Sequence, residues 1–433
     1  MSGFDFEVKN VPVFAKTDVL VVGSGTAGIA AAVQAARCGV KTLLVERYGC
    51  LGGALSVSNV SSYSFSVNRF PKTLSGIPKE IDKRCRAYGA SSPDYRGEGI
   101  FVDSELYKCM LDEWMAEEGV EVMLHTTVIG AYVNEGVVRG VFCHSKSGIG
   151  IILAKSTVDA SGDGDVAAYA GAEFTKREKE KLQPTSVVFG ISDIDVEKFK
   201  KHFQAPGSEG FAKVFDKAAA MGEWKSPKRG GAWKILTQNG DVKSLNLTLI
   251  RETDGTDVFD LTRAEIEGRK QIMHIISLFR KYGKDIGLGD CKLRTIAPQL
   301  GLRETRRIVG EYSLCGEDVR QRRSFDDGIG RLICTIDLYG ETKTNYIPLE
   351  AETFSVPFRA LVPKKIDGIV VAGRCVSCDD TSFGALRLMV GCALTGQAAG
   401  MASALAVRNG VKVRDTDVKE LQNELKKSGV ILD

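Results

Sequence analysis

The sequence is poor in the residues that build metal centres and secreted disulfide frameworks. Only four of its 433 residues are histidine, and no two of them have the spacing of a metal-binding pair. Its eleven cysteines are scattered from Cys38 to Cys392, without the dense spacing of a small secreted domain. We therefore expect no metal centre and a reducing compartment, the cytoplasm.

The sequence also lacks an excess of charge of one sign. Its formal net charge is +3, and the charged run 176–181 mixes lysine and arginine with glutamate. Nucleic-acid binding needs clustered, unbalanced positive charge, so we interpret this run as a solvated surface and expect no nucleic-acid partner. Residues 1–16 contain no continuous apolar run, so no signal peptide is expected.

Long hydrophobic runs are scarce, and only residues 388–407 approach the length of a membrane span. Thr395 and Gln397 interrupt this run, and its many alanines and glycines lower its hydrophobicity. Gly396 and Gly400 have the small-residue spacing that lets two helices approach closely. We expect a buried helix here and no membrane span.

The amino-terminal part of the chain has the pattern of a dinucleotide-binding unit. An apolar strand at 18–22 runs into a glycine turn at 23–28, an alanine-rich helix follows at 29–37, and a second apolar strand at 40–45 ends at Glu46. Because both strands, the helix and the acidic residue are present in order, the pattern predicts that this unit binds a dinucleotide.

Each glycine of the turn has a physical task in such a unit. Gly23 permits the tight turn, Gly25 leaves room for a pyrophosphate, and Gly28 lets the helix pack closely on the strand. The helix amino terminus supplies amide donors and a positive dipole to the phosphates. Glu46 lies eighteen residues beyond Gly28 and can accept hydrogen bonds from the ribose hydroxyls.

A second glycine cluster at 49–54 favours FAD over NAD. A longer cofactor needs backbone that passes closely over its pyrophosphate and ribityl chain. No second glycine fingerprint behind a strand occurs in the middle of the chain, so we expect no permanent NAD(P)H domain. An external electron donor or acceptor is therefore expected.

Two further strands run into glycines, at 157–162 and at 367–373. With the segments 18–53, 158–172, 301–307 and 355–407, the sequence resembles the FAD-dependent oxidoreductase family. This family lies within the glutathione-reductase-like superfamily, which also includes the fumarate reductase and succinate dehydrogenase flavoproteins. The segments occur in the family's order, whereas the region from about 174 to 290 resembles nothing that we can place.

The resemblance implies an α/β fold with a Rossmann-like FAD-binding domain, built on a parallel sheet and a three-stranded β-meander. An α+β substrate or cap domain is expected to be inserted into it. The FAD-binding domain would comprise 1–74, 120–173 and 350–433, with a helical segment at 75–119 linked to it, and the cap would comprise 174–349. Outside the cofactor motifs, helices are expected at 78–86, 105–118, 196–203, 263–281 and 302–312.

The resemblance also implies which residues surround the cofactor. Val128 would supply backbone to the adenine, and the segment 392–395 would point a helix amino terminus at the flavin edge where negative charge accumulates on reduction. The complete set expected at FAD is Gly23, Ser24, Gly25, Thr26, Ala27, Gly28, Glu46, Arg47, Gly52, Gly53, Ala54, Val128, Ala160, Ser161, Gly162, Asp165, Gly373, Arg374, Cys392, Ala393, Leu394 and Thr395.

Arginines are the candidate substrate contacts. Arg387 is similar in position to the arginine that holds a substrate carboxylate in fumarate reductase and L-aspartate oxidase, and an arginine fork suits a carboxylate. A structural salt bridge is the alternative. Arg303 lies in a charged cluster with Glu304, Arg306 and Arg307, which on a helix would either line an anionic site or form salt bridges between domains or subunits.

Histidine and cysteine offer weaker candidates for chemistry. The four histidines are most simply incidental, and His274, within an amphipathic stretch, is the one to test. Cys375 and Cys378 have the spacing of a redox dithiol or half a zinc site, but no second pair supports a metal. Cys50 has no partner in the stretch after it, which argues against disulfide reductase activity.

The leading hypothesis is an FAD-dependent oxidoreductase that transfers a hydride between flavin and a small polar substrate, with a carboxylate as the group that an arginine would hold. The alternatives are a flavin-dependent monooxygenase or halogenase, and a flavin-binding electron-transfer subunit. The near-neutral charge permits a homodimer without requiring one.

Overall fold

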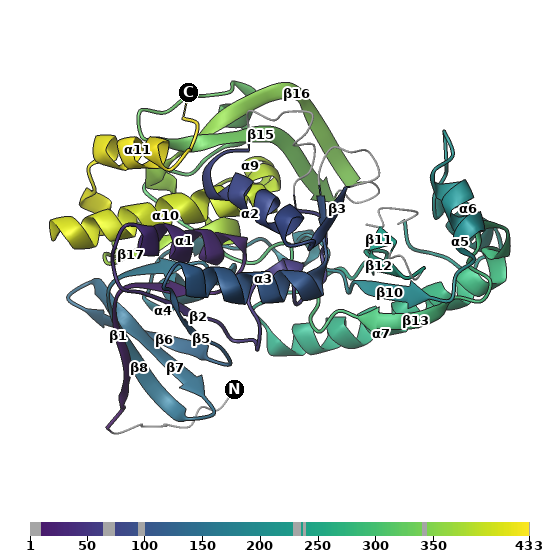
Figure 1. Ribbon diagram of the computed structural model, residues 1–433, viewed down its shortest axis with the longest axis horizontal. Helices are drawn as coiled ribbons and strands as arrows, with labels where there is room; N and C mark the ends of the chain where they lie inside the picture. The colour runs from purple at the N-terminus through teal and green to yellow at the C-terminus, as the bar shows by residue number, and fades with distance from the viewer. Residues whose placement is uncertain are drawn as a thin grey trace.

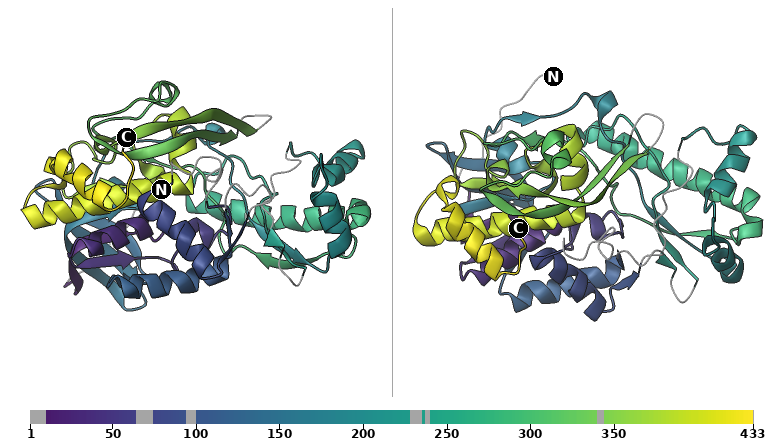
Figure 2. Two further views of the ribbon diagram at one scale, coloured as in Figure 1. Left: turned by 45° about the horizontal axis from the view of Figure 1, so that its top comes forward. Right: turned by 90° about the horizontal axis from the view of Figure 1, so that it is seen from above.

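Two hydrophobic cores organise the chain into a large lobe and a smaller one that projects from it (Figure 1). Figure 2 shows the smaller lobe extending to one side in two further views. The computed structural model describes residues 10–63, 74–93, 100–227, 235–236, 240–339 and 344–432.

The large lobe is built on a seven-stranded mixed sheet. Strands β5, β2, β1, β8 and β17 are parallel, whereas β8, β7 and β6 form an antiparallel meander. Val22, Val45, Asp159 and Val371, the last residues of four parallel strands, share one register level, so these strands end at one edge. The bounds are β5 (Glu121–Met123), β2 (Thr42–Val45), β1 (Val13–Val22), β8 (Gly148–Asp159), β17 (Ile369–Val371), β7 (Val137–Ser145) and β6 (Thr127–Asn134).

Two helices from opposite ends of the chain pack together against this sheet. Helix α1 (Thr26–Arg37) follows β1, and α10 (Met389–Asn409) lies beside it. A Cβ atom at Gly396 would lie 2.0 Å from the Ala27 carbonyl oxygen, and one at Gly400 would lie 2.2 Å from the Ala31 carbonyl oxygen. Only glycine therefore permits this approach. Within the described chain α10 alone has the length and mean hydropathy of a membrane span, and 89% of that stretch is buried.

The remaining helices of the large lobe pack against the sheet, against α10 or against the later strands of the chain. The helices expected at 78–86 and 105–118 are present as α2 and α3, and their apolar faces join the large core. The bounds are α2 (Gly76–Ala87), α3 (Ser104–Glu117), α4 (Asp165–Tyr169), α8 (Gly316–Arg320), α9 (Asp380–Leu386) and α11 (Val418–Lys427), with the short hairpin β3 (Ser91–Pro93) and β4 (Ile100–Val102).

The smaller lobe packs three helices on a four-stranded antiparallel sheet. Helix α5 has the bounds expected from the sequence, and α7 extends the expected helix by a turn at its start. The strand order is β11 (Ile235–Leu236), β12 (Val242–Leu245), β10 (Phe189–Ser192) and β13 (Lys292–Ile296), and the helices are α5 (Val196–Phe203), α6 (Ala212–Ala220) and α7 (Val258–Tyr282).

The structure corrects the expected extent of the cap. The buried residues of the small core run from Val187 to Leu300, whereas Ile308 and later buried residues belong to the large core. The hairpin of β15 (Gly328–Tyr339) and β16 (Thr344–Pro357) therefore packs with the large lobe, because its Ile329, Leu332, Phe354 and Val356 contribute to that core.

The helix expected at 302–312 is wrong. Residues 302–306 have no regular secondary structure, and Arg307 and Ile308 form β14 (Arg307–Ile308), which pairs with β9 (Phe174–Thr175). Buried partners decide the conformation here: Glu304 accepts a hydrogen bond from the Gln183 amide at 3.0 Å, and Arg307 pairs with Asp380 at 2.6 Å. These tertiary contacts override helix propensity.

We predict that Gly396→Ala destabilises the protein by about 3 kcal/mol, because the new methyl group meets backbone rather than a movable side chain. Ser403→Ala on the same helix is the control, since the Ser403 hydroxyl is buried without a hydrogen-bond partner and its removal should change stability by less than about 0.5 kcal/mol. Equal denaturation midpoints for the two variants would contradict the close approach.

Candidate cofactor and substrate site

A cavity of about 720 Å³ opens at the edge where the four parallel strands end and reaches the smaller lobe. Gly23, Glu46 and Gly373 line it from the sheet, while Asn246 and Gln299 line it from the smaller lobe. Cavities at this edge of a parallel sheet are the usual ligand sites of such folds. The site therefore lies between the two cores.

The glycine turn has the geometry of a phosphate cradle. Gly23 has a φ of +92°, and a Cβ there would lie 2.6 Å from the Ala160 carbonyl oxygen. A Cβ on Gly28 would lie 1.7 Å from the Gly23 carbonyl oxygen, so the helix packs tightly on the turn. By contrast, a Cβ on Gly25 would meet no atom within 4 Å and would enter the cavity. No side chain caps α1, so its first amides remain available to an anion.

Glu46 is held rigidly at the end of β2. One carboxylate oxygen accepts hydrogen bonds from the Ser24 amide at 2.8 Å and the Ser24 hydroxyl at 2.6 Å, and the other accepts from the Tyr48 amide at 3.0 Å. The side chain lines the cavity although only 5% of the residue is exposed. This arrangement fits a carboxylate that receives ribose hydroxyls.

The loop of the second glycine cluster lies directly against the first. A Cβ on Gly53 would lie 2.7 Å from the Gly25 Cα atom, and Gly52 has a φ of +107°. The Gly52 amide donates to the Ser24 carbonyl at 3.0 Å. Two backbone segments without side chains thus line the same part of the cavity, as an extended cofactor requires.

A buried carboxyl supports the third segment. Asp159, at the end of β8, is fully buried and accepts hydrogen bonds from the Ser161 amide, the Ser161 hydroxyl and the Ala167 amide at 3.1, 2.6 and 2.9 Å. Burial raises the pKa of this carboxyl to about 6, although the hydrogen bonds oppose the shift. Ser161 is thereby fixed beside the cavity.

Asp163 connects the two strand ends at 157–162 and 367–373 to the 301–307 segment. Its carboxylate accepts hydrogen bonds from the Thr305 hydroxyl at 2.8 Å and from Arg374 at 2.9 Å. Arg306 donates to the Asp163 carbonyl at 3.1 Å and to Asp165 at 2.9 Å. The charged cluster therefore divides: Arg306 and Arg307 make structural pairs, and only Arg303 lines the cavity.

The cavity brings together nearly all of the residues expected at the cofactor. Gly28 is an exception, because it packs on the turn behind the cavity wall. The others are Ala393, Leu394 and Thr395, which do not line the cavity because α10 begins at Met389, earlier than expected. Its first turn up to Cys392 forms the wall instead. The Thr395 hydroxyl accepts a hydrogen bond from the Gly373 amide at 3.0 Å and so positions the wall from behind.

Two arginines are fixed to one strand at the other end of the cavity. Arg387 donates to the Asp337 carboxylate at 2.9 Å and to its backbone carbonyl, and only 8% of its side chain is exposed. The Arg303 guanidinium stacks over the Tyr339 ring at 4.6 Å and donates to the Ser186 hydroxyl at 2.9 Å. Asp337 and Tyr339 are two residues apart on β15, so they lie on the same face of the strand.

The cavity wall carries an excess of positive charge. Of its described residues, five are arginines and three are carboxylates, and none is lysine or histidine. This balance suits a pyrophosphate at one end and an anionic group at the other. The arginines are Arg47, Arg251, Arg303, Arg374 and Arg387, and the carboxylates are Glu46, Asp165 and Asp337.

His274 does not belong to this site. It lies on the outer side of α7, where its ring nitrogen Nε2 is 2.7 Å from the Glu223 carbonyl oxygen and its ring stacks with Trp224 at 6.0 Å. It is absent from the described cavity wall. An amphipathic helix pattern gave no information on which of its polar residues would face a distant cavity.

The cysteine pair is buried and unbonded. Cys375 and Cys378 are both free, and desolvation raises the pKa of Cys375 well above its usual range and that of Cys378 to about 12. Neutral buried thiols are poor redox groups. Among the residues that the structure describes, no group of three or more metal-ligating side chains occurs.

Sequence reasoning missed the substrate end of the cavity almost entirely. Tyr63, Asn246, Gln299, Asp337 and Tyr339 all line the wall. The alternation of polar and apolar residues at 337–339 indicates a strand with one polar face, which was the available signal. Asn246 and Gln299 come from the smaller lobe, so their place at the cavity depends on how that lobe folds.

Comparison with known families identifies this architecture. A family model described as FAD dependent oxidoreductase matches residues 18–425. The chain belongs to this family. FAD is its cofactor, and the glycine turn, Glu46 and the opposed glycine loop are the residues that fit it.

Curated relatives agree with this assignment over part of their length. The chain is 26% identical over 215 residues to a probable electron transfer flavoprotein-quinone oxidoreductase of Escherichia coli, covering 46% of this chain and 48% of that protein. It is 28% identical over 219 residues to digeranylgeranylglycerophospholipid reductase 2 of Methanothermobacter thermautotrophicus, covering 47% and 54%. The chain thus spans about half the length of these relatives.

A solved structure shares the fold. The myxobacterial chondrochloren halogenase CndH superposes with a TM-score of 0.50 at 12% identity, covering 95% of this chain and 79% of that one. At this identity the likeness shows the fold alone.

We predict that Gly25→Ala lowers FAD affinity by at least about tenfold, because the methyl group enters the space for the pyrophosphate. The Gly25 φ of −62° is compatible with alanine, so the fold should persist. Gly130→Ala is the matched control, since its Cβ would make an ordinary contact 3.6 Å from Phe142. Flavin content after dialysis, read at the flavin absorption band, checks this; equal retention by both variants would contradict the assignment.

We predict that Asp159 makes stability depend on pH. Because its folded-state pKa lies above the unfolded value, its contribution is full below pH about 4 and is lost as the pH rises through about 6. Relative to Asp159→Asn, the wild type should lose about 3 kcal/mol of unfolding free energy over this window. Parallel denaturation curves of the two proteins at all pH values would contradict the raised pKa.

Proposed function

We propose that this protein oxidises or reduces a small polar organic substrate that carries a carboxylate, with bound FAD as the hydride carrier. The observation that supports this most directly is the continuity of the cavity. One cavity is lined both by the dinucleotide-binding features and by Arg303 and Arg387. When bound, FAD supplies the hydride chemistry, while the protein binds, orients and shields the substrate.

The two arginines would hold the substrate by its anionic group. Arg387 is almost fully buried, and its Nε atom has no hydrogen-bond partner. A buried donor without a partner is costly, so a ligand oxygen at this position would be favourable. Asp337 holds the guanidinium in place from one side, and the stack on Tyr339 does the same for Arg303.

The first turn of α10 provides electrostatic support. Residues 388–392 line the cavity, and no side chain caps this helix. The helix amino terminus therefore presents free amides and its positive dipole end to the cavity, which favours negative charge there. The Cys392 thiol in this turn has a pKa raised to about 11 by burial, so it stays neutral and adds no opposing charge.

Proton transfer would fall to groups on β15. The cavity wall described here lacks histidine and lysine, and Asp337 and Tyr339 are the carboxylate and phenol that contact the two arginines. Asp337 is already paired with Arg387. The Tyr339 hydroxyl, 3.5 Å from an Arg303 nitrogen, is therefore our candidate proton donor.

Electron transfer to a partner protein is the second candidate. It is suggested by the relative that carries an electron-transfer name. An electron-transfer subunit needs an exposed flavin edge, whereas here the cavity with the dinucleotide features is also lined by Arg303 and by Arg387, whose side chain is only 8% exposed. This continuity favours substrate turnover on the chain itself. The cytoplasmic location and a homodimer remain predictions.

We predict that Arg387→Gln lowers kcat/KM for a carboxylate substrate by about a hundredfold, the loss expected of a charged contact. The assay is reoxidation of anaerobically photoreduced enzyme by unsaturated acids, with fumarate and crotonate as the first probes and their amides as uncharged counterparts. Arg331→Gln is the control, because Arg331 lies on β15, the strand that holds Arg387 through Asp337, but donates to Thr353 outside the cavity.

The discriminating result is the comparison between acid and amide. If Arg387 holds a carboxylate, the variant should lose its preference for the acid while retaining bound FAD. The opposite result is that neither acid nor amide reoxidises the wild type, whereas a one-electron acceptor does. That result would contradict the proposed substrate chemistry and support electron transfer to a partner protein.

A further inference from the structure

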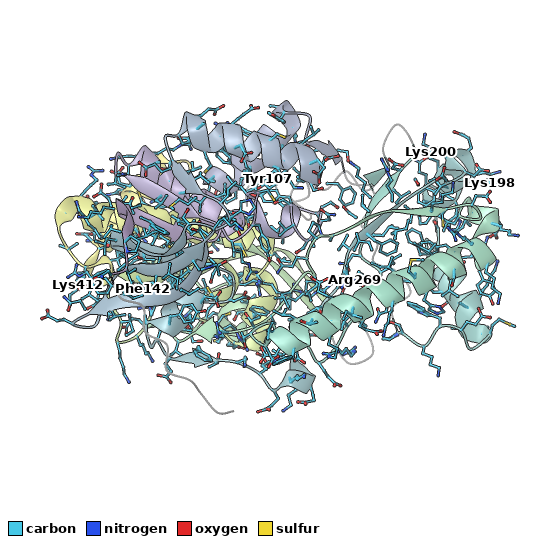
Figure 3. All side chains as sticks on the ribbon, turned by 90° about the horizontal axis from the view of Figure 1, so that it is seen from below. Tyr107, Phe142, Lys198, Lys200, Arg269 and Lys412 are labelled. Carbon is cyan, nitrogen blue, oxygen red and sulfur yellow. The ribbon has the colours of Figure 1, made fainter. Side chains whose placement is uncertain are left out.

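Helix α7 has a buried apolar face and an exposed face that also carries apolar residues. Its inner face packs into the small core through Ala264, Ile272 and Ile276. Its outer face forms one side of the projecting lobe, as seen from below in Figure 3, where Arg269 lies on this helix. The outer face does not line the cavity and has no role in the proposed function.

Apolar side chains recur on the outer face at every seventh residue. Phe259 is 76% exposed, Ile266 is 46% exposed and Met273 is 55% exposed, and Val258 beside them is 65% exposed. Large apolar side chains at such exposure in one row mark an interaction surface, whereas single ones do not. Seven residues are close to two helical turns, so the row follows the helix axis.

Every charged residue on the exposed face of α7 is basic. Arg263, Arg269, Lys270, Arg280 and Lys281 are all exposed. Some of them have a neighbouring acid: Arg269 pairs with Glu265 at 3.0 Å, and Lys281 pairs with Glu223 at 2.6 Å. Their side chains nevertheless remain 48% and 56% exposed, so their charge reaches solvent.

The acidic residues of the same helix are buried or half-buried. The Glu265 carboxylate accepts a hydrogen bond from the Leu300 amide at 2.7 Å, and Asp260 accepts one from the Asp254 amide at 3.0 Å. Glu267 is half-buried and accepts from Gln271 at 3.1 Å. Asp260 and Glu265 also pair with Arg263 and Arg269, at 3.7 and 3.0 Å. None of the three acids is itself exposed, so the charged side chains on the exposed face are basic.

A partner helix fits this face poorly. A helical seam needs apolar residues three or four positions after each member of the row. Those positions hold Thr262 and Arg263, then Arg269 and Lys270. A second copy packed antiparallel about Ile266 would place Arg263 opposite Arg269, so like charges would oppose self-association.

We propose that the outer face of α7 binds the surface of an anionic lipid bilayer. The apolar row would enter the boundary between headgroups and acyl chains, while the lysine and arginine side chains reach the phosphates around it. Basic amphipathic helices of this composition lie in the plane of the membrane surface. Charge complementarity therefore selects an anionic bilayer over a neutral one.

Vesicle co-sedimentation of the FAD-loaded protein tests this surface. We expect binding to phosphatidylcholine vesicles containing about one third phosphatidylglycerol, and binding at least about tenfold weaker to phosphatidylcholine alone. The double variant Phe259→Ser with Ile266→Ser should reduce binding by about tenfold or more. The double variant Arg269→Gln with Lys270→Gln should reduce it by a similar factor and flatten its dependence on salt.

Lys198→Gln with Lys200→Gln is the matched control. It removes the same charge from the same lobe, but from exposed positions on α5 (Figure 3). The control should bind vesicles as the wild type does. All these residues are exposed and outside the cavity wall, so flavin content should stay unchanged in every variant.

Three results would overturn the proposal. The first is no vesicle binding by the wild type at low salt, and the second is equal loss of binding in the α5 and α7 charge variants. The third is a dimer in sedimentation velocity that the α7 variants dissociate, which would identify a second copy as the occupant. None of these depends on turnover, so the proposal and the proposed function can fail separately.

Discussion

The contact between α1 and α10 is the constraint on which the cofactor site depends. These helices are separated by about 350 residues of chain, and their backbones touch because Gly396 and Gly400 lack side chains. The contact sets the amino terminus of α10 beside the glycine turn that begins α1. Both helix dipoles therefore meet one cavity, although they come from opposite ends of the sequence.

A buried polar pair fixes the register of this contact. Gln397 donates to Gln34 at 2.8 Å, and its carbonyl oxygen accepts from the Ile77 amide at 2.9 Å. Both glutamines are almost fully buried. A slip of one residue along either helix would leave these amides unpaired, which a core does not tolerate. Glycine thus permits the approach, and the glutamines specify its position.

The difference between local motifs and contacts that are distant in sequence explains what could be predicted from the sequence. The glycine turn, Glu46 and the second glycine loop are local in sequence, and each has a task that only one residue type performs, so their place at the cofactor could be predicted. Residues 302–312 were not predictable in this way. Their conformation depends on buried partners such as Gln183 and Asp380, which are distant in sequence. Local propensity carries no record of such partners.

The substrate end illustrates the limit further. Arg387 was found through a resemblance in position, but Asp337, which holds it, lies on a hairpin that was assigned to the other domain. An arginine lines a cavity when one side of its guanidinium has no protein partner, and it bridges two elements when protein groups occupy both sides. In Arg306 and Arg307 that side is occupied by carboxylates, whereas Arg303 and Arg387 each have one side toward the cavity.

The net charge of +3 does not reveal the two locally basic surfaces, the cavity wall and the outer face of α7. The cavity wall gathers five arginines against three carboxylates, and the outer face of α7 exposes bases while the acids of that helix are buried or half-buried. Composition averages over these regions, so it excludes a uniformly basic protein but not a locally basic one. Charge acts on a ligand over about a Debye length, near 8 Å in physiological salt, and at that distance the local excess decides.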